Sequence, residues 1–368
     1  MTSALQPPLT LIAELTHRCP LHCVYCSNPL EMVQKNKELP KEIWARTLKE
    51  AAELGVLQVD FTGGEPAARP DLAELVRAAR EAGLYVNLIT SGLSLDERRL
   101  EELVRAGTDH LQLSFQGARE ESPIEFAGVP AQAQKLRVAR WARQRAIGLT
   151  LNFVVHRQNL DQLEEMISLT EEIGPERVEF ANVQYYGWAF ANRDLLLPTR
   201  TQLDHSLEII KSAEERLRGK TRVEYVVPDY YARYPKACMG GWGQKAILIT
   251  PAGDALPCHA AQLIPGMTFE NLRKRPLRDI WENSEAFRRF RGEGWMPEPC
   301  KSCDRRGLDF GGCRCQAWLV AGNAEQTDPV CSKSPRRLIV DSILARINRN
   351  GQSAAPAHSD WTYRVNPG

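Results

Sequence analysis

The sequence lacks the features that would place the chain in a membrane or against a polyanion. No stretch of about 18 uncharged apolar residues occurs, so no transmembrane helix is predicted. The opening segment, MTSALQPPLTLIAEL, has neither a basic stretch before its apolar run nor a small-residue cleavage site. Neither sign of charge dominates, because 47 Lys and Arg residues face 46 Asp and Glu residues. We therefore expect a cytoplasmic protein that binds neither nucleic acid nor membrane.

Cysteine is absent from most of the chain and is concentrated in two groups. Three of the 10 cysteines lie early in the chain, and none occurs between residues 26 and 238. The first group is Cys19, Cys23 and Cys26, and the second is Cys238, Cys258, Cys300, Cys303, Cys313, Cys315 and Cys331. In a reducing compartment, thiols clustered in this way are metal ligands more often than disulfides. Two separate groups indicate two different binding roles.

Short apolar segments alternate with amphipathic ones over the first part of the chain. Amphipathic segments such as 40–55 and 70–83 carry proline near their start and glycine at their end, as helices do. The segments predicted as strands are 9–15, 56–61, 85–90, 110–115, 149–155 and 177–183. A strand followed by a helix about six times predicts an α/β fold with a parallel sheet, either doubly wound or a full or partial barrel.

This alternation ends near residue 225. Segment 226–245 is rich in turn formers and aromatic residues, and segment 247–258 predicts a hairpin that bends at Gly253. A region with weak periodicity and clustered ligands usually folds around its metal. The final residues are small and polar, which favours a frayed end. We predict a barrel domain over 1–224, a cysteine-rich domain over 225–348 and a flexible tail over 349–368.

The first cysteine group forms the motif CxxxCxxC directly after the first predicted strand. Three cysteines on an iron-sulfur cluster leave one iron open to a ligand that can react, whereas a structural zinc takes four protein ligands. A catalytic zinc completed by His17 or His22 is the alternative. Each histidine is more readily explained as a hydrogen-bonding neighbour of the cysteines than as a ligand.

A second motif, Gly63-Gly64-Glu65-Pro66, follows the second predicted strand. Glycines allow a backbone to approach a ligand closely, and a carboxylate can hold a cationic amine. Alone this motif is only a turn. In parallel α/β folds, however, the strands end at one face, so motifs after the first two strands should face the same pocket.

Taken together, the two motifs resemble those of the radical S-adenosylmethionine (AdoMet) superfamily. The resemblance implies that Cys19, Cys23 and Cys26 are the catalytic cysteines and hold a [4Fe-4S] cluster, whose open iron chelates AdoMet. It implies that Gly63, Gly64 and Glu65 bind the methionyl part of AdoMet. It also implies that Tyr25, the residue before the last cysteine, lies near the adenine. It also implies a partial (β/α)6 TIM-like barrel.

The second cysteine group contains a CxxC pair at Cys300 and Cys303, followed by Cys313 and Cys315 in a CRC sequence. Seven thiolates nearly fill two sites with four ligands each. From spacing alone, one or two structural zinc ions remain an alternative to iron-sulfur clusters.

This region resembles the SPASM extension of peptide-modifying radical AdoMet enzymes, with Asp309 at the place of one cysteine of that pattern. The resemblance implies two auxiliary iron-sulfur clusters, of [4Fe-4S] or [2Fe-2S] type. One would be held by Cys300, Cys303, Asp309 and Cys331, and the other by Cys238, Cys258, Cys313 and Cys315. An oxygen ligand would shift the potential of its cluster.

Over nearly the whole chain the sequence is similar to the peptide cyclases of pyrroloquinoline quinone (PQQ) biosynthesis, which share the Asp-for-Cys replacement. The resemblance implies that the enzyme joins Glu and Tyr side chains of the precursor peptide PqqA by a carbon-carbon bond. The implied partners are the peptide chaperone PqqD and an external electron donor such as flavodoxin. The alternatives are another SPASM enzyme, such as a thioether-forming maturase or an anaerobic sulfatase-maturing enzyme, and a noncatalytic zinc or electron-transfer protein.

Four aromatic residues complete the prediction. Tyr185, Tyr186 and Trp188 follow the sixth predicted strand and could line a peptide pocket, although aromatic clusters are more often core. Trp242 is expected to pack beside an auxiliary cluster.

Overall fold

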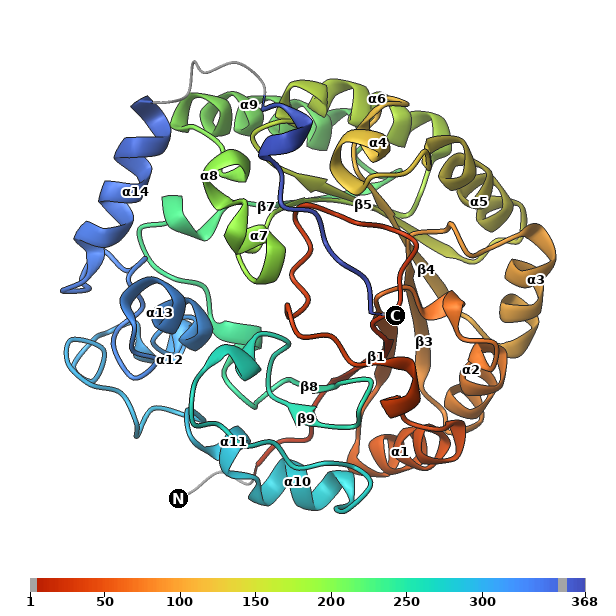
Figure 1. The fold of residues 1–368 in the computed structure, drawn as a ribbon, viewed down its shortest axis with the longest axis horizontal. Coiled ribbons are helices and arrows are strands. Elements are labelled where there is room, and N and C mark those ends of the chain that lie inside the picture. Colours follow the sequence, from red (N-terminus) through yellow and green to blue (C-terminus); the bar gives the residue numbers. More distant parts are fainter. Residues whose placement is uncertain (1–4, 350–355, 368) are drawn as a thin grey trace.

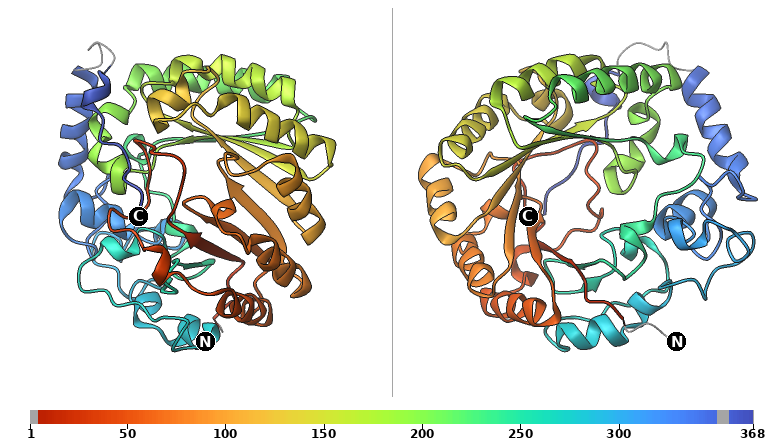
Figure 2. Two further views of the ribbon diagram at one scale, coloured as in Figure 1. Left: turned by 45° about the vertical axis from the view of Figure 1, so that its right-hand side comes forward. Right: turned by 180° about the vertical axis from the view of Figure 1, so that it is seen from behind.

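The computed structural model describes residues 5–349 and 356–367. Its centre is a nine-stranded sheet with the order β7-β6-β5-β4-β3-β2-β1-β8-β9, curved so that helices cover its outer side (Figures 1 and 2). Neighbouring strands are parallel except for the β8–β9 pair. The strands are β1 Thr10–Thr16, β2 Gln58–Gly63, β3 Tyr85–Thr90, β4 His110–Phe115, β5 Gly148–Val155, β6 Arg177–Asn182, β7 Arg222–Val226, β8 Ala246–Ile249 and β9 Ala255–Leu256.

Most helices of the first part of the chain lie around the outside of the sheet, whereas the two short helices that follow β6 lie toward the open centre of the ring (Figure 1). They are α1 Lys41–Leu54, α2 Leu72–Glu81, α3 Glu97–Ala106, α4 Ser122–Ala127, α5 Gln132–Gln144, α6 Leu163–Ile173, α7 Gly187–Ala191, α8 Arg193–Leu196 and α9 Arg200–Arg216. The later part of the chain carries α10 Leu277–Asn283, α11 Glu285–Arg288, α12 Arg306–Asp309, α13 Arg314–Ala321 and α14 Arg337–Arg349.

Helix α1 shows why these segments form where the sequence predicts them. Pro40 occupies the N-cap position, and Gly55 ends the helix in the left-handed conformation with φ of 106°. Trp44, Leu48 and Ala51 recur on one side at helical spacing and are fully buried against the sheet. The apolar face of the helix and the residues that mark its start and its end therefore all come from local sequence.

All six strands predicted from the sequence are present, and the fold is the expected partial barrel. The predicted hairpin is also present, since β8 and β9 pair in antiparallel fashion around Gly253, whose φ is 97°. Strand β8 pairs in parallel with β1 on the side away from β2. Among the described residues, β7 and β9 form the two ends of the sheet, so the sheet is not closed.

Two parts of the expected organisation differ from the structure. The predicted boundary after residue 224 falls inside β7, and β8 and β9 extend the barrel sheet although they lie within the predicted second domain. The predicted flexible tail lies partly outside the described residues. Its described part, residues 356–367, packs on the fold: Trp361 is 7% exposed and Arg364 is 4% exposed. In the described parts of the chain, no helix combines the length and the apolar character needed to cross a bilayer.

Candidate active site

The first cysteine group lies in the loop that leaves β1, at the end of the sheet where the parallel strands finish. Cys19, Cys23 and Cys26 line one cavity of about 270 Å³. Backbone hydrogen bonds from the loop to α4 hold it in place, with His22 N donating to Ala127 O at 2.9 Å. The structure therefore directs all three sulfur-bearing side chains into a common space.

Neither nearby histidine completes a zinc site. His17 is 1% exposed; its Nδ1 accepts the Val33 N–H at 3.0 Å, and its Nε2 lies 3.4 Å from the Glu14 carboxylate. His22 Nδ1 lies 2.9 Å from a backbone carbonyl oxygen. Neither histidine lines the cavity, and its described lining contains no carboxylate. Three sulfurs without a fourth protein ligand fit an iron-sulfur cluster with one open corner better than a zinc ion.

The three thiols are poor anions without a metal. Burial raises the pKa of Cys19 to about 11 and that of Cys23 to about 12, and it also raises the pKa of Cys26. Thiolates bind metals, so a bound metal must displace these protons. The Arg364 guanidinium beside the loop lowers the pKa of Cys19 and Cys26 and so favours the thiolate form that a cluster needs.

Gly63 and Gly64 form one wall of the cavity. A Cβ on Gly63 would lie 2.3 Å from Thr16 O, and one on Gly64 would lie 2.4 Å from Arg18 O. The backbone after β2 therefore packs directly against the backbone that leads to Cys19. The predicted reason for these glycines was close approach to a ligand, but the structure shows that close packing of the two loops already requires them.

Glu65 is placed differently from the prediction. Its side chain is fully buried and is not part of the cavity lining. One carboxylate oxygen accepts hydrogen bonds from Ala67 N at 3.0 Å and Thr90 Oγ1 at 2.7 Å, and the other accepts from Ser91 N at 2.8 Å and from Ser91 Oγ. In this structure Glu65 therefore joins the loops after β2 and β3, and its contact with AdoMet stays a prediction.

Tyr25 lines the cavity, as expected for a residue beside a bound cofactor. Its ring is 9% exposed and lies 5.5 Å from the ring of His156, centroid to centroid. Burial raises the pKa of the Tyr25 hydroxyl well above its ordinary value and lowers the pKa of His156 to about 3. Both rings are therefore uncharged at neutral pH, and the Tyr25 ring forms part of the cavity wall.

The second cysteine group is divided between two places. Cys238, Cys258, Cys313 and Cys315 are joined by hydrogen bonds between their sulfurs. Hydrogen bonds to Cys258 and Cys313 raise the pKa of Cys238, and accepting such bonds lowers the pKa of Cys258 and Cys313. The four cysteines therefore lie together, and their assignment as ligands of one cluster stays a prediction.

The remaining predicted ligands meet at a separate small cavity. Cys300, Cys303, Asp309 and Cys331 all line it. Asp309 is 8% exposed at the end of α12, and Lys333 Nζ donates to Cys303 Sγ at 3.2 Å. The structure thus brings a carboxylate together with three thiols, and it adds a lysine that the sequence did not indicate.

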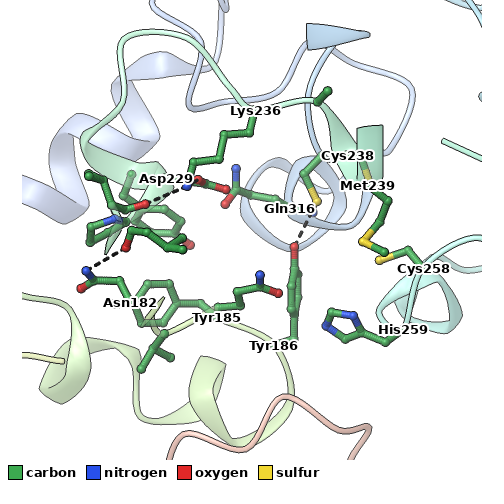
Figure 3. Close-up of a pocket in the computed structure, with 18 residues that line it drawn as sticks. Asn182, Tyr185, Tyr186, Asp229, Lys236, Cys238, Met239, Cys258, His259 and Gln316 are labelled. Atoms are coloured by element: carbon green, nitrogen blue, oxygen red, sulfur yellow. Dashed lines mark hydrogen bonds and ion pairs between the residues drawn. The ribbon is translucent and has the colours of Figure 1, made fainter. Parts of the chain in front are cut away.

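A second cavity, of about 170 Å³, is drawn in Figure 3 and shares part of its wall with the cavity beside the first cysteine group. Asn182, Val183 and Gln184 line both this cavity and the one beside the first cysteine group. At its far side it reaches Cys258 and Cys313. A molecule held here would lie between the first cysteine group and the gathered sulfurs of the second.

The cavity wall contains two of the predicted aromatic residues. Tyr185 and Tyr186 line it, and the Tyr186 hydroxyl lies 3.0 Å from Cys313 Sγ (Figure 3). Trp188 is 5% exposed and is not among the lining residues, so it is a packing residue. Trp242 packs in a cluster with Cys238, as predicted, and donates its indole N–H to Ala286 O at 2.8 Å.

A charged pair lies on the opposite wall of the same cavity. Lys236 Nζ is 3.0 Å from Asp229 Oδ1 (Figure 3). Burial raises the pKa of Asp229, whereas the lysine lowers it. These two residues were not predicted, and their only sequence signal is their place in the segment that follows β7.

Sequence reasoning also missed two buried cations near the first cysteine group. Lys135 on α5 is fully buried and donates to Ser91 O at 3.0 Å, and burial lowers its pKa to about 8. Arg364, near the end of the printed sequence, lines the cavity itself. A helix position spaced as core could have drawn attention to Lys135, but nothing local to residue 364 indicates its position.

Two protein-family models match the chain. The Radical SAM superfamily model matches residues 13–170, which contain the first cysteine group and GGEP. A model described as an iron-sulfur cluster-binding domain, SPASM, matches residues 238–304.

Solved structures with the same fold include SuiB of Streptococcus suis bound to S-adenosylmethionine, with a TM-score of 0.73 and 22% identity over 89% of this chain and 77% of that one. Another is anSMEcpe with bound AdoMet, with a TM-score of 0.61 and 17% identity over 95% of this chain and 99% of that one. At these identities the likeness concerns the fold.

Curated relatives are much more similar. The chain is 56% identical over 330 residues to the PqqA peptide cyclase of Gluconobacter oxydans, covering 89% of this chain and 92% of the relative. It is 51% identical over 344 residues to that of Granulibacter bethesdensis, covering 93% and 92%. It is 48% identical over 366 residues to that of Methylobacterium nodulans, covering 99% and 95%. The chain therefore belongs to the PqqA peptide cyclase family of radical SAM enzymes.

Proposed function

We propose that the enzyme joins a Glu side chain to a Tyr ring within the PqqA precursor peptide, as the first step of PQQ biosynthesis. The observation that carries this proposal is identity of about half the residues, over nearly the full length of both chains, to relatives named PqqA peptide cyclase. The proposed bond connects the Glu γ-carbon to the ring carbon next to the Tyr hydroxyl.

The proposal assigns the cysteines to three iron-sulfur clusters. Cys19, Cys23 and Cys26 would hold a [4Fe-4S] cluster with AdoMet at its open iron, beside Tyr25 and the Gly63–Gly64 wall. The two auxiliary iron-sulfur clusters would take Cys238, Cys258, Cys313 and Cys315, and Cys300, Cys303, Asp309 and Cys331. The cluster and AdoMet together would supply a hydrogen-abstracting radical, which this bond requires because neither partner carbon is acidic or electrophilic.

The two adjacent cavities support a peptide substrate that reaches from the first cysteine group toward Cys258 and Cys313. The shared wall of Asn182–Gln184 would place a peptide side chain close to the first group. Joining the two side chains removes two hydrogens from the peptide, one as a hydrogen atom and the other as a proton and an electron. Tyr186 and Cys313, which are in contact at the far side, lie where that electron could leave.

The proposal also includes a substrate peptide and two partners. SuiB, which shares the fold, has been solved bound to its precursor peptide SuiA, and we propose PqqA as the corresponding substrate here. A short flexible peptide loses much conformational entropy on binding, so delivery by the chaperone PqqD would lower that cost. An external one-electron donor such as flavodoxin would reduce the first cluster.

The test is an anaerobic assay with full-length protein, AdoMet, reductant and PqqA peptide, with and without PqqD. The expected product is a peptide about two mass units lighter, with fragments that connect Glu to Tyr. Cys26→Ala should abolish both deoxyadenosine and product. The matched control, Ser168→Ala on the exposed side of α6, should leave both unchanged.

Two results would contradict the proposal. Deoxyadenosine formation with an unmodified peptide, or with a thioether in place of the carbon-carbon link, would indicate a different SPASM chemistry. Zinc in place of iron in anaerobically purified protein would remove the proposed radical source.

A further inference from the structure

Arg364 presents a buried positive charge to the first cysteine group. Its side chain lines the cavity, with Nη1 3.6 Å from Cys26 Sγ, and the residue is 4% exposed. Nη2 donates to His17 O and lies 3.5 Å from Met32 Sδ. The buried Nε has no hydrogen-bond partner in the described residues. The guanidinium is therefore held in place without satisfying all of its donors.

Among residues 5–349 and 356–367, this cation has no acidic partner. The contacts of Arg364 with the described residues are with a thiol, a thioether and backbone groups, and none is with a carboxylate. Burying an unpaired charge is strongly unfavourable, so buried arginines are normally paired with anions. A thiolate at Cys26 would be the missing anion.

A short segment fixes the arginine in this position. We call residues 361–366 the strap. In Figure 1 it is part of the blue segment that runs into the centre of the molecule. Arg364 N donates to His22 O at 3.3 Å, and His22 Nδ1 lies 2.9 Å from Arg364 O. Asn366 Nδ2 donates to Leu21 O at 3.2 Å. The strap therefore binds to the loop between Cys19 and Cys23.

The other end of the strap is bound to helices near this loop. The backbone of Thr362 exchanges two hydrogen bonds with the Asn192 side chain, at 2.9 and 2.7 Å. The Asn192 amide also donates to Val24 O, within the cysteine loop, at 2.7 Å. Trp361 packs edge-on against Phe126, with ring centroids 6.2 Å apart. Contacts on both sides of residue 364 limit how far its side chain can move from Cys26.

We propose that Arg364 is a positioning residue whose fixed charge stabilises the thiolate at Cys26 and raises the reduction potential of the cluster held there. The inference rests on the proposed cluster at Cys19, Cys23 and Cys26. Three thiolates place negative charge on the cluster, and an electron from a low-potential one-electron donor adds more. A cation beside a ligand sulfur stabilises the reduced form most, since that form carries the greater negative charge.

An alternative anion is the carboxylate of bound AdoMet. The observed distance to Cys26 favours the thiolate, and the two sources are separable by experiment. If the thiolate is the partner, removing the charge alters the cluster in the absence of AdoMet. If the carboxylate is the partner, only AdoMet affinity changes.

The test compares three variants of the full-length protein, reconstituted anaerobically. Arg364→Gln removes the charge, and Arg364→Lys retains it. The matched control Arg346→Gln makes the same change at a half-exposed residue of α14 that pairs with Asp194. The midpoint potential of the first cluster is measured without AdoMet by a redox titration followed by electron paramagnetic resonance. The auxiliary cluster signals report on correct folding.

At the wild-type midpoint potential, we expect the ratio of reduced to oxidised first cluster to be about tenfold lower in Arg364→Gln, which corresponds to a shift of about 59 mV to more negative potential for a one-electron couple. Arg364→Lys should recover most of this shift, and Arg346→Gln should show none. A first cluster that loses its iron in Arg364→Gln but keeps it in Arg364→Lys also supports the proposal.

An unchanged potential in Arg364→Gln, with or without weaker AdoMet binding, would overturn it. Loss of iron in both Arg364 variants would do so as well, because packing of the guanidinium, not its charge, would then hold the loop. Absence of the first cluster from the wild-type protein would instead refute the proposed function.

Discussion

Replacing Gly63 by alanine tests whether the loops after β1 and β2 must touch backbone to backbone. Gly63 has a φ of 129°, and an added Cβ would lie 2.3 Å from Thr16 O. A left-handed backbone costs an L-residue about 1–2 kcal/mol, and relieving an overpacked contact typically costs about 1–3 kcal/mol more. We therefore expect Gly63→Ala to lower the free energy of unfolding by about 2–5 kcal/mol.

The matched control is Gly83→Ala. Gly83 also has a positive φ, 87°, but an added Cβ would meet nothing within 4 Å. Only the backbone cost should apply there, so the two variants should differ by about 1–3 kcal/mol in urea unfolding followed by circular dichroism. Gly63→Ala should also bind less iron, because the displaced backbone leads to Cys19. Equal unfolding energies and iron contents in the two variants would refute the argument.

Two further changes test other parts of the site. Asp309→Ala should remove or alter the spectroscopic signal of one auxiliary cluster and leave the AdoMet-binding cluster formed, because Asp309 lies with Cys300 and Cys331 and away from the first cavity. Identical auxiliary spectra in mutant and parent would contradict the assignment of Asp309 as a ligand. His156 is fully buried, and burial lowers its pKa to about 3. Between about pH 6.5 and 3 the unfolded chain therefore binds a proton that the folded chain does not. The free energy of unfolding consequently falls as pH decreases through that range. At about 1.36 kcal/mol per pH unit, this contribution is about 2 kcal/mol between pH 6.5 and 5. His156→Phe should remove it, as measured by urea unfolding at pH 7 and 5; an equal pH dependence in mutant and parent would show that His156 is not responsible.

Local signals were sufficient for the barrel elements. Strand β2 alternates polar and apolar residues, β5 is rich in apolar residues, and helices such as α1 are bounded by proline and glycine. These signals act over a few residues, where steric preference and side-chain periodicity decide the conformation. The domain boundary near residue 225 was not readable in this way, because β8 joins the sheet by pairing with a strand more than 200 residues earlier.

The sequence by itself identified the clustered cysteines as candidate metal ligands. It also showed that the first two motifs each follow a strand, and parallel strands end at the same face. The tertiary structure decided which side chains meet across long separations: Arg364 lies 338 positions after Cys26 and is nevertheless beside it. It also decided that Glu65 joins two loops and does not line the cavity, and that Asn182–Gln184 form a wall shared by the two cavities. The physical reason is that sequence spacing determines distances only within a helix, strand or turn. Contacts between distant segments depend on how the curved sheet brings its strand ends and the returning strap around a common centre.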